Sequence, residues 1–267
     1  MNEERPILRL SAVTKRFGGM TAIDDLSFDV RRGSRTALIG PNGAGKTTVF
    51  NVVTGAVAID GGQVFVDGED ITRIPPRRRI RHGVARSFQN VRLMPHLSTL
   101  ENVMVGQHCR NGGLRGTLQP VNLVPRNRWR EAARAALADA SLEQYAGLTV
   151  KNLPYGVQKR VEVVRAMMAQ PRLLLLDEPA AGLNSAETAA LQTLLQRICV
   201  GGAVTLLVVE HDMHFVGALC DAVVVLDFGR KIAEGTPAEV RADARVQEIY
   251  LGTPISDATE RRHARSA

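Results

Sequence analysis

The strongest constraint on how this chain folds is the glycine-rich segment GPNGAGKT at residues 40–47. It fits the pattern G-x-x-x-x-G-K-[ST]. A short apolar run at residues 36–39 precedes it, and a stretch with helical apolar spacing follows at residues 47–54. Strand, glycine-rich loop and helix in this order form the phosphate-binding unit of α/β proteins. The sequence therefore predicts a P-loop NTPase core, in which helices flank a mostly parallel sheet.

The chemistry of this loop predicts nucleotide binding. Its glycines let successive backbone N–H groups point inward around phosphate oxygens, where side chains would obstruct them. The lysine reaches the β- and γ-phosphates as a point charge, and the threonine hydroxyl after it is a ligand for Mg²⁺. The alternative is a glycine-rich turn with a solvated lysine. The predicted ATP-binding residues are Gly40, Pro41, Asn42, Gly43, Ala44, Gly45, Lys46, Thr47 and Thr48.

A second part of the predicted site is the pair Asp177 and Glu178, which directly follows four consecutive leucines at residues 173–176. Such a run predicts a buried strand, and ligands bind at the carboxyl ends of the strands in open parallel sheets. Acidic residues at a strand end are weak evidence for a functional site on their own, but together with the phosphate loop they are strong evidence. We predict that Asp177 binds Mg²⁺ and that Glu178 orients and polarises the attacking water.

Other patterns complete the predicted α/β organisation. Strand signals at residues 7–10, 26–30 and 64–67 predict an antiparallel β subdomain in the N-terminal part of the chain. Apolar runs at residues 204–209 and 223–226 predict two more buried strands.

The predicted domain organisation is one ATPase domain over residues 1–252, with an α-helical subdomain inserted at about residues 91–168. The last residues, 253–267, lack a periodic apolar pattern and predict a loose tail. No uncharged apolar run approaches the roughly 18 residues of a membrane helix, and the start of the chain lacks the apolar core of a secretory signal. We therefore expect a cytoplasmic location.

The net charge of +7 raises the question of a nucleic-acid partner. However, 29 of the 34 basic residues are arginines spread along the chain, which indicates an arginine-rich composition and not a basic surface for nucleic acid. We expect the densest cluster, at residues 77–86, to be a solvated face beside a helix start. The three cysteines share no metal-type spacing and predict unpaired thiols.

With these motifs in this order, the chain resembles the nucleotide-binding subunits of ABC transporters from about residue 8 to residue 252. In that family, Gln89 matches the Q-loop glutamine, which contacts the metal and water, and His211 matches the switch histidine. Phe17 takes the place of the aromatic residue that stacks on adenine, although it also fits the protein core. The resemblance implies catalytic roles for Glu178, His211, Gln89 and Lys46, and magnesium ligation by Thr47, Gln89 and Asp177.

The family's signature motif, L-S-G-G-Q, holds the nucleotide bound to the other subunit. Gly156 matches its central glycine and is expected to contact the partner's nucleotide. Pro154 replaces the serine and has neither a hydroxyl nor an N–H group, and Val157 replaces the glutamine. We expect an asymmetric dimer, in which the site that uses this signature hydrolyses ATP more slowly. Reverting both residues is expected to raise turnover.

Within the family, the chain is most similar to the ATPase subunits of branched-chain amino acid importers, at residues 176–184, 210–213 and 250–252. This implies a second ATPase subunit, with a heterodimer favoured over a homodimer, two membrane permease subunits and, indirectly, an extracytoplasmic solute-binding protein. The expected place is the cytoplasmic face of the inner membrane. The alternatives are a lipid or lipopolysaccharide exporter ATPase and a soluble ATPase acting on nucleic acid or ribosomes, although we expect no nucleic-acid partner.

Overall fold

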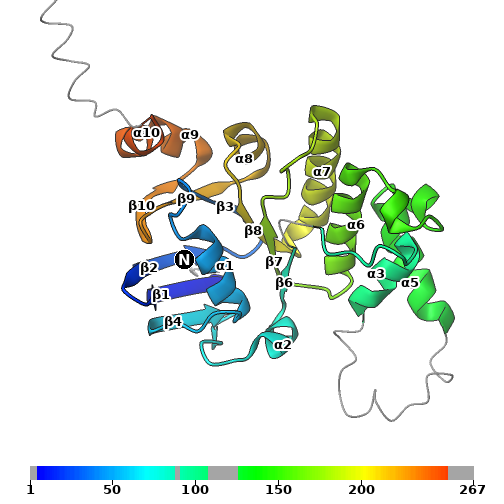
Figure 1. Cartoon of the computed structure of the whole chain (residues 1–267), viewed down its shortest axis with the longest axis horizontal. Coiled ribbons are helices and arrows are strands. Elements are labelled where there is room, and N and C mark those ends of the chain that lie inside the picture. Colours follow the sequence, from blue (N-terminus) through cyan, green and yellow to red (C-terminus); the bar gives the residue numbers. More distant parts are fainter. Residues whose placement is uncertain (1–4, 88–90, 108–125, 252–267) are drawn as a thin grey trace, which may run out of the picture.

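The computed structural model describes residues 5–87, 91–107 and 126–251, and this part of the chain holds two sheets (Figure 1). In the larger sheet, all residues of two central strands are buried, as expected for parallel strands covered on both faces. In spatial order the strands of the larger sheet are β10 (Arg230–Gly235), β9 (Ala222–Asp227), β3 (Arg35–Ile39), β8 (Thr205–Val209), β7 (Leu173–Asp177) and β6 (Val84–Arg86).

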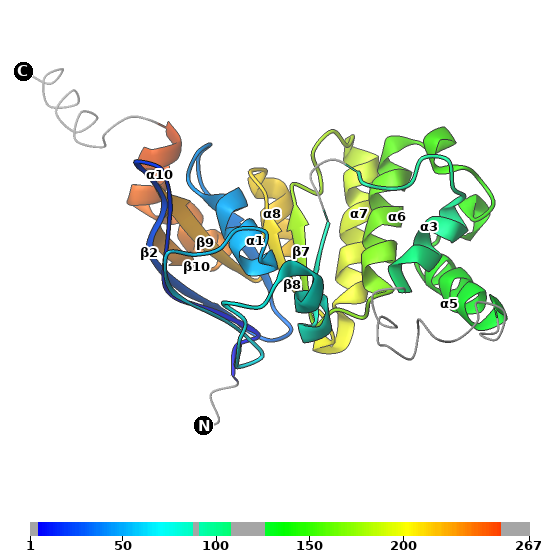
Figure 2. The same cartoon turned by 60° about the horizontal axis from the view of Figure 1, so that its bottom comes forward.

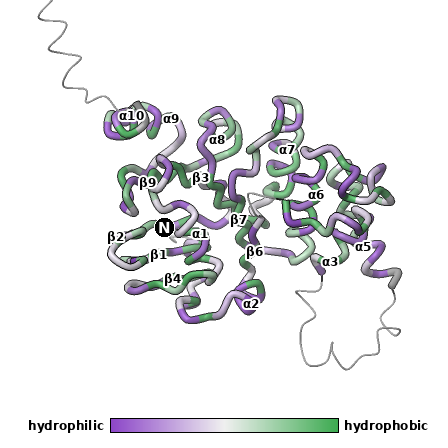
Figure 3. Tube along the Cα trace, viewed as in Figure 1, coloured by the Kyte–Doolittle hydropathy of each residue, from purple (hydrophilic) through white to green (hydrophobic). Residues whose placement is uncertain are grey.

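The pairing of these strands confirms a mostly parallel sheet. Strands β9, β3, β8, β7 and β6 are parallel to their neighbours, and only β10 pairs antiparallel, with β9. Strands β3, β7, β8 and β9 confirm the four apolar runs that predict buried strands, whereas no sequence pattern above predicts β6 or β10. Hydrophobic residues concentrate along these central strands (Figure 3).

The smaller sheet confirms the predicted antiparallel β subdomain. Its strands are longer than the strand signals, and they lie in the order β2 (Met20–Val30), β1 (Leu8–Phe17), β4 (Gly61–Val66) and β5 (Glu69–Asp70). Helix α1 (Lys46–Thr54) packs in the core between the two sheets through Val49, Phe50 and Val53. Because α1 begins at the end of the phosphate loop, this packing fixes the loop relative to both sheets.

The helices α3 (Thr99–Val105), α5 (Arg126–Asp139) and α6 (Tyr155–Met167) form a lobe at the end of the molecule away from the smaller sheet (Figures 1 and 2). This lobe shares a hydrophobic core with α7 (Ser185–Ile198) and the sheet. The boundaries predicted for the inserted subdomain stay predictions, and residues 253–267 lie outside the described residues. The described part of the chain also contains the helices α2 (Pro76–Arg79), α8 (Met213–Leu219), α9 (Pro237–Ala242) and α10 (Ala244–Leu251) and the 3₁₀ turns η1 (Ile80–His82), η3 (Glu143–Tyr145), η4 (Val150–Asn152) and η5 (Val200–Gly202).

The arginine cluster at residues 77–86 is a solvated face only in part. Arg77, Arg78 and Arg81 are exposed, as expected. Arg79, however, is 4% exposed, and the side chain of Arg86 is 10% exposed. The prediction is wrong for these two residues because each guanidinium group reaches buried oxygen acceptors, which offset the cost of burying its charge.

Candidate functional site

The phosphate loop connects β3 to α1 at the carboxyl end of the parallel strands. The φ angles of Gly40, Gly43 and Gly45 are +148°, +84° and +101°, values that side chains disfavour. A Cβ on Gly40 would lie 2.1 Å from the carbonyl oxygen of Leu226, and one on Gly45 would lie 2.6 Å from that of Ala22. A Cβ on Gly43 would meet no atom within 4 Å. The loop is therefore pressed against backbone on one side and open on the other, as a phosphate cradle requires.

Lys46 begins α1, and its side chain turns back over this loop. Its Nζ donates hydrogen bonds to the carbonyl oxygens of Gly40 at 2.6 Å and Pro41 at 2.9 Å. Burial lowers the pKa of Lys46, and the charges of Glu178 and Asp177 oppose this shift. Because the loop follows β3 and the acidic pair ends β7, and both strands are parallel to β8 between them, the loop and the pair lie at the same edge of the sheet and form one site.

The acidic pair lies where β7 ends. Asp177 is the last residue of the strand, its side chain is 8% exposed, and its Oδ2 accepts a hydrogen bond from Nη2 of Arg86 at 2.5 Å. Glu178 has a φ of +46°, which is uncommon for a residue with a side chain, and its N–H donates to the carbonyl of Val209 at 2.9 Å. Strand pairing therefore holds the backbone of Glu178 at the same edge of the sheet where β8 ends.

His211 lies at this edge too, because it follows β8. Its side chain is exposed, and the preceding residue, Glu210, is 1% exposed. The Glu210 carboxylate accepts hydrogen bonds from the N–H groups of Ala180 at 2.8 Å and His211 at 3.2 Å, and burial raises the pKa of Glu210. Glu210 thus ties the loop after β7 to the loop after β8. The family resemblance includes Glu210 in a matching segment but gives it no role, although a charge directly after a buried strand is a signal for one.

Phe17 ends β1, and the structure excludes the alternative that it belongs to the core. Its side chain is 48% exposed, and Nζ of Lys15 lies 5.2 Å from the centre of its ring. An exposed ring can offer a face to a planar base. Gln89 lies outside the described residues, so the structure does not place it.

Gly156 lies in the first turn of α6, in the lobe, whereas α1 lies on the other side of β7 and β8 (Figures 1 and 2). The structure therefore does not bring Gly156 to the phosphate loop of its own chain. A Cβ on Gly156 would lie 2.6 Å from the Glu187 side chain, so the close packing of α6 against α7 favours glycine here.

The donor set at the site fits Mg²⁺. The Asp177 carboxylate and the Thr47 hydroxyl are hard oxygen ligands, and Mg²⁺ typically takes one or two protein ligands besides substrate phosphates. Among the described residues, no group of three or more histidine, cysteine or acidic side chains forms a metal cluster.

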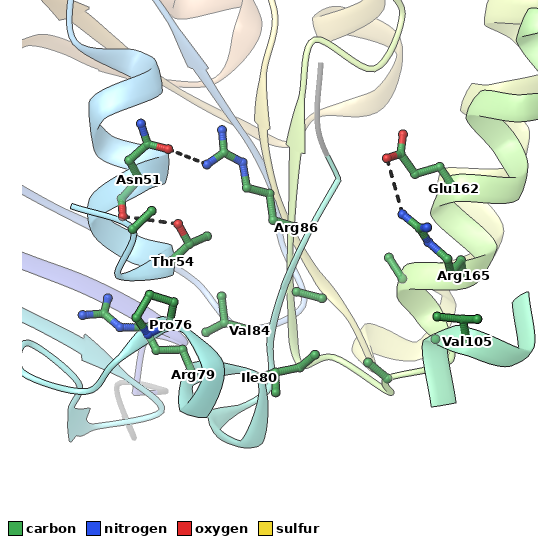
Figure 4. Close-up of a pocket in the computed structure, with 15 residues that line it drawn as sticks. Asn51, Thr54, Pro76, Arg79, Ile80, Val84, Arg86, Val105, Glu162 and Arg165 are labelled. Atoms are coloured by element: carbon green, nitrogen blue, oxygen red, sulfur yellow. Dashed lines mark hydrogen bonds and ion pairs between the residues drawn. The ribbon is translucent and has the colours of Figure 1, made fainter. Parts of the chain in front are cut away.

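A cavity of about 470 Å³ lies between the α1–α2 region and the lobe, and we call it the lobe groove (Figure 4). Apolar side chains line most of it, with a few charged groups between them. Its lining includes Asn51, Thr54, Pro76, Arg79, Ile80, Val84, Arg86, Val105, Glu162 and Arg165.

A phosphate loop facing strand-end acids, on a mostly parallel sheet with an antiparallel β subdomain, defines a P-loop ATPase. Comparison with known proteins narrows this class. The ABC transporter family profile matches residues 23–181, and the profile of branched-chain amino acid ATP-binding cassette transporters matches residues 230–255. The chain belongs to the ATP-binding proteins of ABC transporters, in the branched-chain amino acid transporter family.

The relatives agree with this placement. The chain is 42% identical over 253 residues to the high-affinity branched-chain amino acid transport ATP-binding protein BraF of Pseudomonas aeruginosa, covering 93% of this chain and 98% of BraF. It is 38% identical over 251 residues to LivG of Escherichia coli K12, which has the same description, with the same two coverages. Both the predicted family and the predicted ATPase activity are confirmed.

Among solved structures, the ADP conformation of MJ1267, an ATP-binding cassette of an ABC transporter, is similar with a TM-score of 0.83 and 31% identity. The similarity covers 93% of this chain and all of that one. This confirms the predicted fold class. In the part of the chain that the structure describes, no helix combines the length and apolar character needed to cross a membrane.

Proposed function

We propose that this chain is the ATP-binding and ATP-hydrolysing subunit that energises import of branched-chain amino acids, at the cytoplasmic face of the inner membrane. The observation that carries the proposal is one site, shared by the phosphate loop, Lys46 and the acids Asp177 and Glu178, in a chain 42% identical to BraF. The branched-chain profile favours this function over a lipid exporter ATPase or a soluble ATPase.

In the proposed reaction, the loop N–H groups and Lys46 bind the triphosphate. Lys46 gives up the carbonyl oxygens of Gly40 and Pro41 for phosphate oxygens. Mg²⁺ would supply positive charge to the phosphate oxygens, held by Thr47 and Asp177, with Gln89 as the third proposed ligand.

Glu178 then orients the attacking water and accepts its proton, and His211, at the end of the neighbouring strand, contacts the γ-phosphate. Phe17 stacks on adenine. The contribution of the chain is positioning and charge stabilisation.

The proposed partner is a second ATPase subunit whose nucleotide contacts this chain's signature at Gly156. Pro154 is the N-cap of α6 and makes no side-chain capping bond there, so this signature lacks the hydroxyl group of the family's serine. The two nucleotide sites of the dimer are then expected to differ, which favours a heterodimer. The Val157 side chain, in contrast, is 5% exposed and packs in the lobe core. Changing it to glutamine would bury an amide, so the expectation that both reversions raise turnover is replaced by one for Pro154→Ser alone.

The proposed membrane partners are two permease subunits, which an extracytoplasmic binding protein supplies with solute. We place the docking site for a cytoplasmic helix of the permease in the lobe groove, because the groove is mostly apolar and lies between the core and the lobe. No nucleic-acid partner is part of the proposal.

The test compares two variants of the complex, assembled with its permeases in proteoliposomes. Lys46→Ala should abolish productive ATP binding. Glu178→Gln should leave binding intact and slow hydrolysis by roughly 10²- to 10⁴-fold, because it removes the base that prepares the water. Glu248→Gln makes the same chemical change at an exposed helix position and serves as the control.

The readouts are nucleotide binding, phosphate release and uptake of labelled leucine. Hydrolysis at the normal rate by Glu178→Gln would contradict the role of Glu178. Leucine uptake that does not depend on ATP would contradict the energising role of this chain, and intact hydrolysis without leucine uptake would contradict the proposed substrate.

A further inference from the structure

Arg86 connects three elements around the site. It is the last residue of β6, and its Nη2 donates to Oδ2 of Asp177 on β7 at 2.5 Å. Its Nη1 donates to Oδ1 of Asn51 on α1 at 2.6 Å, a contact that Figure 4 shows. The guanidinium carbon lies 5.5 Å from the centre of the Phe50 ring. The side chains of Arg86 and Asp177 are only 10% and 8% exposed. The two charges therefore interact with little screening by water.

This ion pair occupies the carboxylate that we assign to Mg²⁺. A guanidinium in contact with Asp177 neutralises its charge, and a divalent cation brought to the same carboxylate is repelled by the guanidinium. The two cations repel each other, so binding of the metal at this carboxylate is disfavoured for as long as the guanidinium stays in contact with it. The affinity of this site for Mg²⁺ therefore depends on Arg86 as well as on the metal ligands, because the positive charge of Arg86 raises the free energy of metal binding.

We propose that Arg86 is the resident counter-ion of Asp177, and that the magnesium ion of Mg·ATP competes with it for this carboxylate. Arg86 is then a positioning residue that sets the magnesium requirement of the ATPase. The proposal rests on the assignment of Asp177 within the proposed function. It assigns a role to a residue outside the sequence motifs that identify the nucleotide site.

The surroundings of Arg86 allow its guanidinium to withdraw without losing all polar partners. Asn51 holds the second amino group independently of Asp177. Arg86 and Asn51 both line the lobe groove, and so does Glu162, a second carboxylate that is 2% exposed. A guanidinium that leaves Asp177 toward this groove therefore stays in a lining with hydrogen-bond acceptors.

The test titrates Mg²⁺ against binding of a fluorescent ATP analogue by the purified chain. Arg86→Gln removes the charge but retains hydrogen-bond donors, so magnesium has to displace only a neutral hydrogen bond. The half-saturating Mg²⁺ concentration should fall by about tenfold, because hydrogen bonds to charged groups are markedly stronger than neutral ones. Arg86→Lys keeps a positive charge but cannot bond Asp177 and Asn51 through two separate amino groups. It should lower the half-saturating Mg²⁺ concentration by about threefold.

The control is Arg78→Gln, the same change at an exposed position near Arg86 in sequence, which should leave the requirement unchanged. An equal or higher magnesium requirement in Arg86→Gln would overturn the proposal, since it would mean that Arg86 holds Asp177 in place for the metal. If Arg86→Gln does not fold, Arg86→Lys decides in the same way. Binding of the analogue in EDTA and in Mg²⁺ distinguishes failure of the Arg86 proposal from failure of the proposed function. If the wild-type chain binds no nucleotide with or without magnesium, the proposed function itself fails.

Discussion

Replacing Arg79 with alanine removes an arginine that the structure buries against backbone carbonyl groups. Two of its acceptors, the carbonyls of Val52 and Val53, lie in the last turn of α1, where the regular i+4 donors of the helix are missing; the Val52 carbonyl also accepts the N–H of the C-cap Gly55. A cation at this end also interacts favourably with the helix dipole. The hydrogen bonds run to the carbonyl oxygens of Val52 at 2.6 Å, Val53 at 2.9 Å, Ile74 at 2.8 Å and Thr72 at 3.1 Å. Arg79 therefore joins α1, whose other end carries the phosphate loop, to the segment before α2.

The expected loss is set by two opposing effects. Hydrogen bonds to a charged group contribute about 1.5–3 kcal/mol each, and removing one partner of a buried charged network costs about 3–5 kcal/mol. Burial of the guanidinium opposes this, as shown by the lowered pKa of Arg79, for which burial is the main cause. We expect Arg79→Ala to lower the free energy of unfolding by about 3 kcal/mol, which is about 6–12 °C in melting temperature for a chain of this size.

The assay is thermal unfolding of the purified chain, followed by circular dichroism. Arg77→Ala is the matched control, because it makes the same change at an exposed position of the same short helix and should stay within about 0.5 kcal/mol of the wild type. Equal melting temperatures for the two variants would refute the reasoning, since the cost of burying the guanidinium would then cancel its hydrogen bonds.

Other expected outcomes concern the loop, the signature and the thiols. Gly40→Ala should lower the melting temperature by several degrees, because its Cβ would lie 2.1 Å from a carbonyl oxygen, whereas Gly43→Ala, with open space around it, should cost only about 1 kcal/mol and act mainly on ATP binding. Pro154→Ser should raise ATP turnover of the assembled complex, and unchanged phosphate release would contradict the asymmetric dimer. Burial raises the pKa of Cys199 to about 11 and that of Cys220 to about 12, so alkylation at pH 8, followed by peptide mass spectrometry, should be about 100-fold slower at Cys199 and about 1000-fold slower at Cys220 in the folded chain than in urea. Because unfolded thiols ionise first, the free energy of unfolding should fall as the pH rises above about 9 and through these values.

The parts of the fold that sequence patterns predict are those in which burial is continuous along the chain. The four leucines of β7 and the apolar run of β8 identify buried strands without any tertiary information. Strand β6 has three residues, and the edge strand β10 has only two adjacent apolar side chains, Ile232 and Ala233, between charged residues, so neither produces such a run. Helix α7 had a usable signal in its capping box, formed by Asn184 and Glu187.

The residues of the candidate site also divide into those that local sequence motifs predict and those that only the fold brings together. Lys46 and the acidic pair follow from local motifs, because the loop and the strand end are contiguous in sequence. The contact between Arg86 and Asp177 joins residues 91 positions apart, so no spacing rule predicts it. Arg79 and its exposed neighbours look alike in sequence, and only the position of α1 decides which arginine is buried.

Glu178 shows how the fold can impose a geometry that its own residue disfavours. A non-glycine residue at positive φ costs about 1–3 kcal/mol and persists only where its surroundings determine the backbone. Here the Glu178 N–H is bonded to the carbonyl of Val209, and its own carbonyl lies 3.5 Å from Nζ of the buried Lys159 on α6. The backbone of the proposed catalytic acid is thus held between the end of β8 and the helix that begins at the signature motif. Because a glutamine at this position keeps both backbone contacts, Glu178→Gln changes the chemistry of the side chain without releasing the strain, which is why it separates hydrolysis from binding.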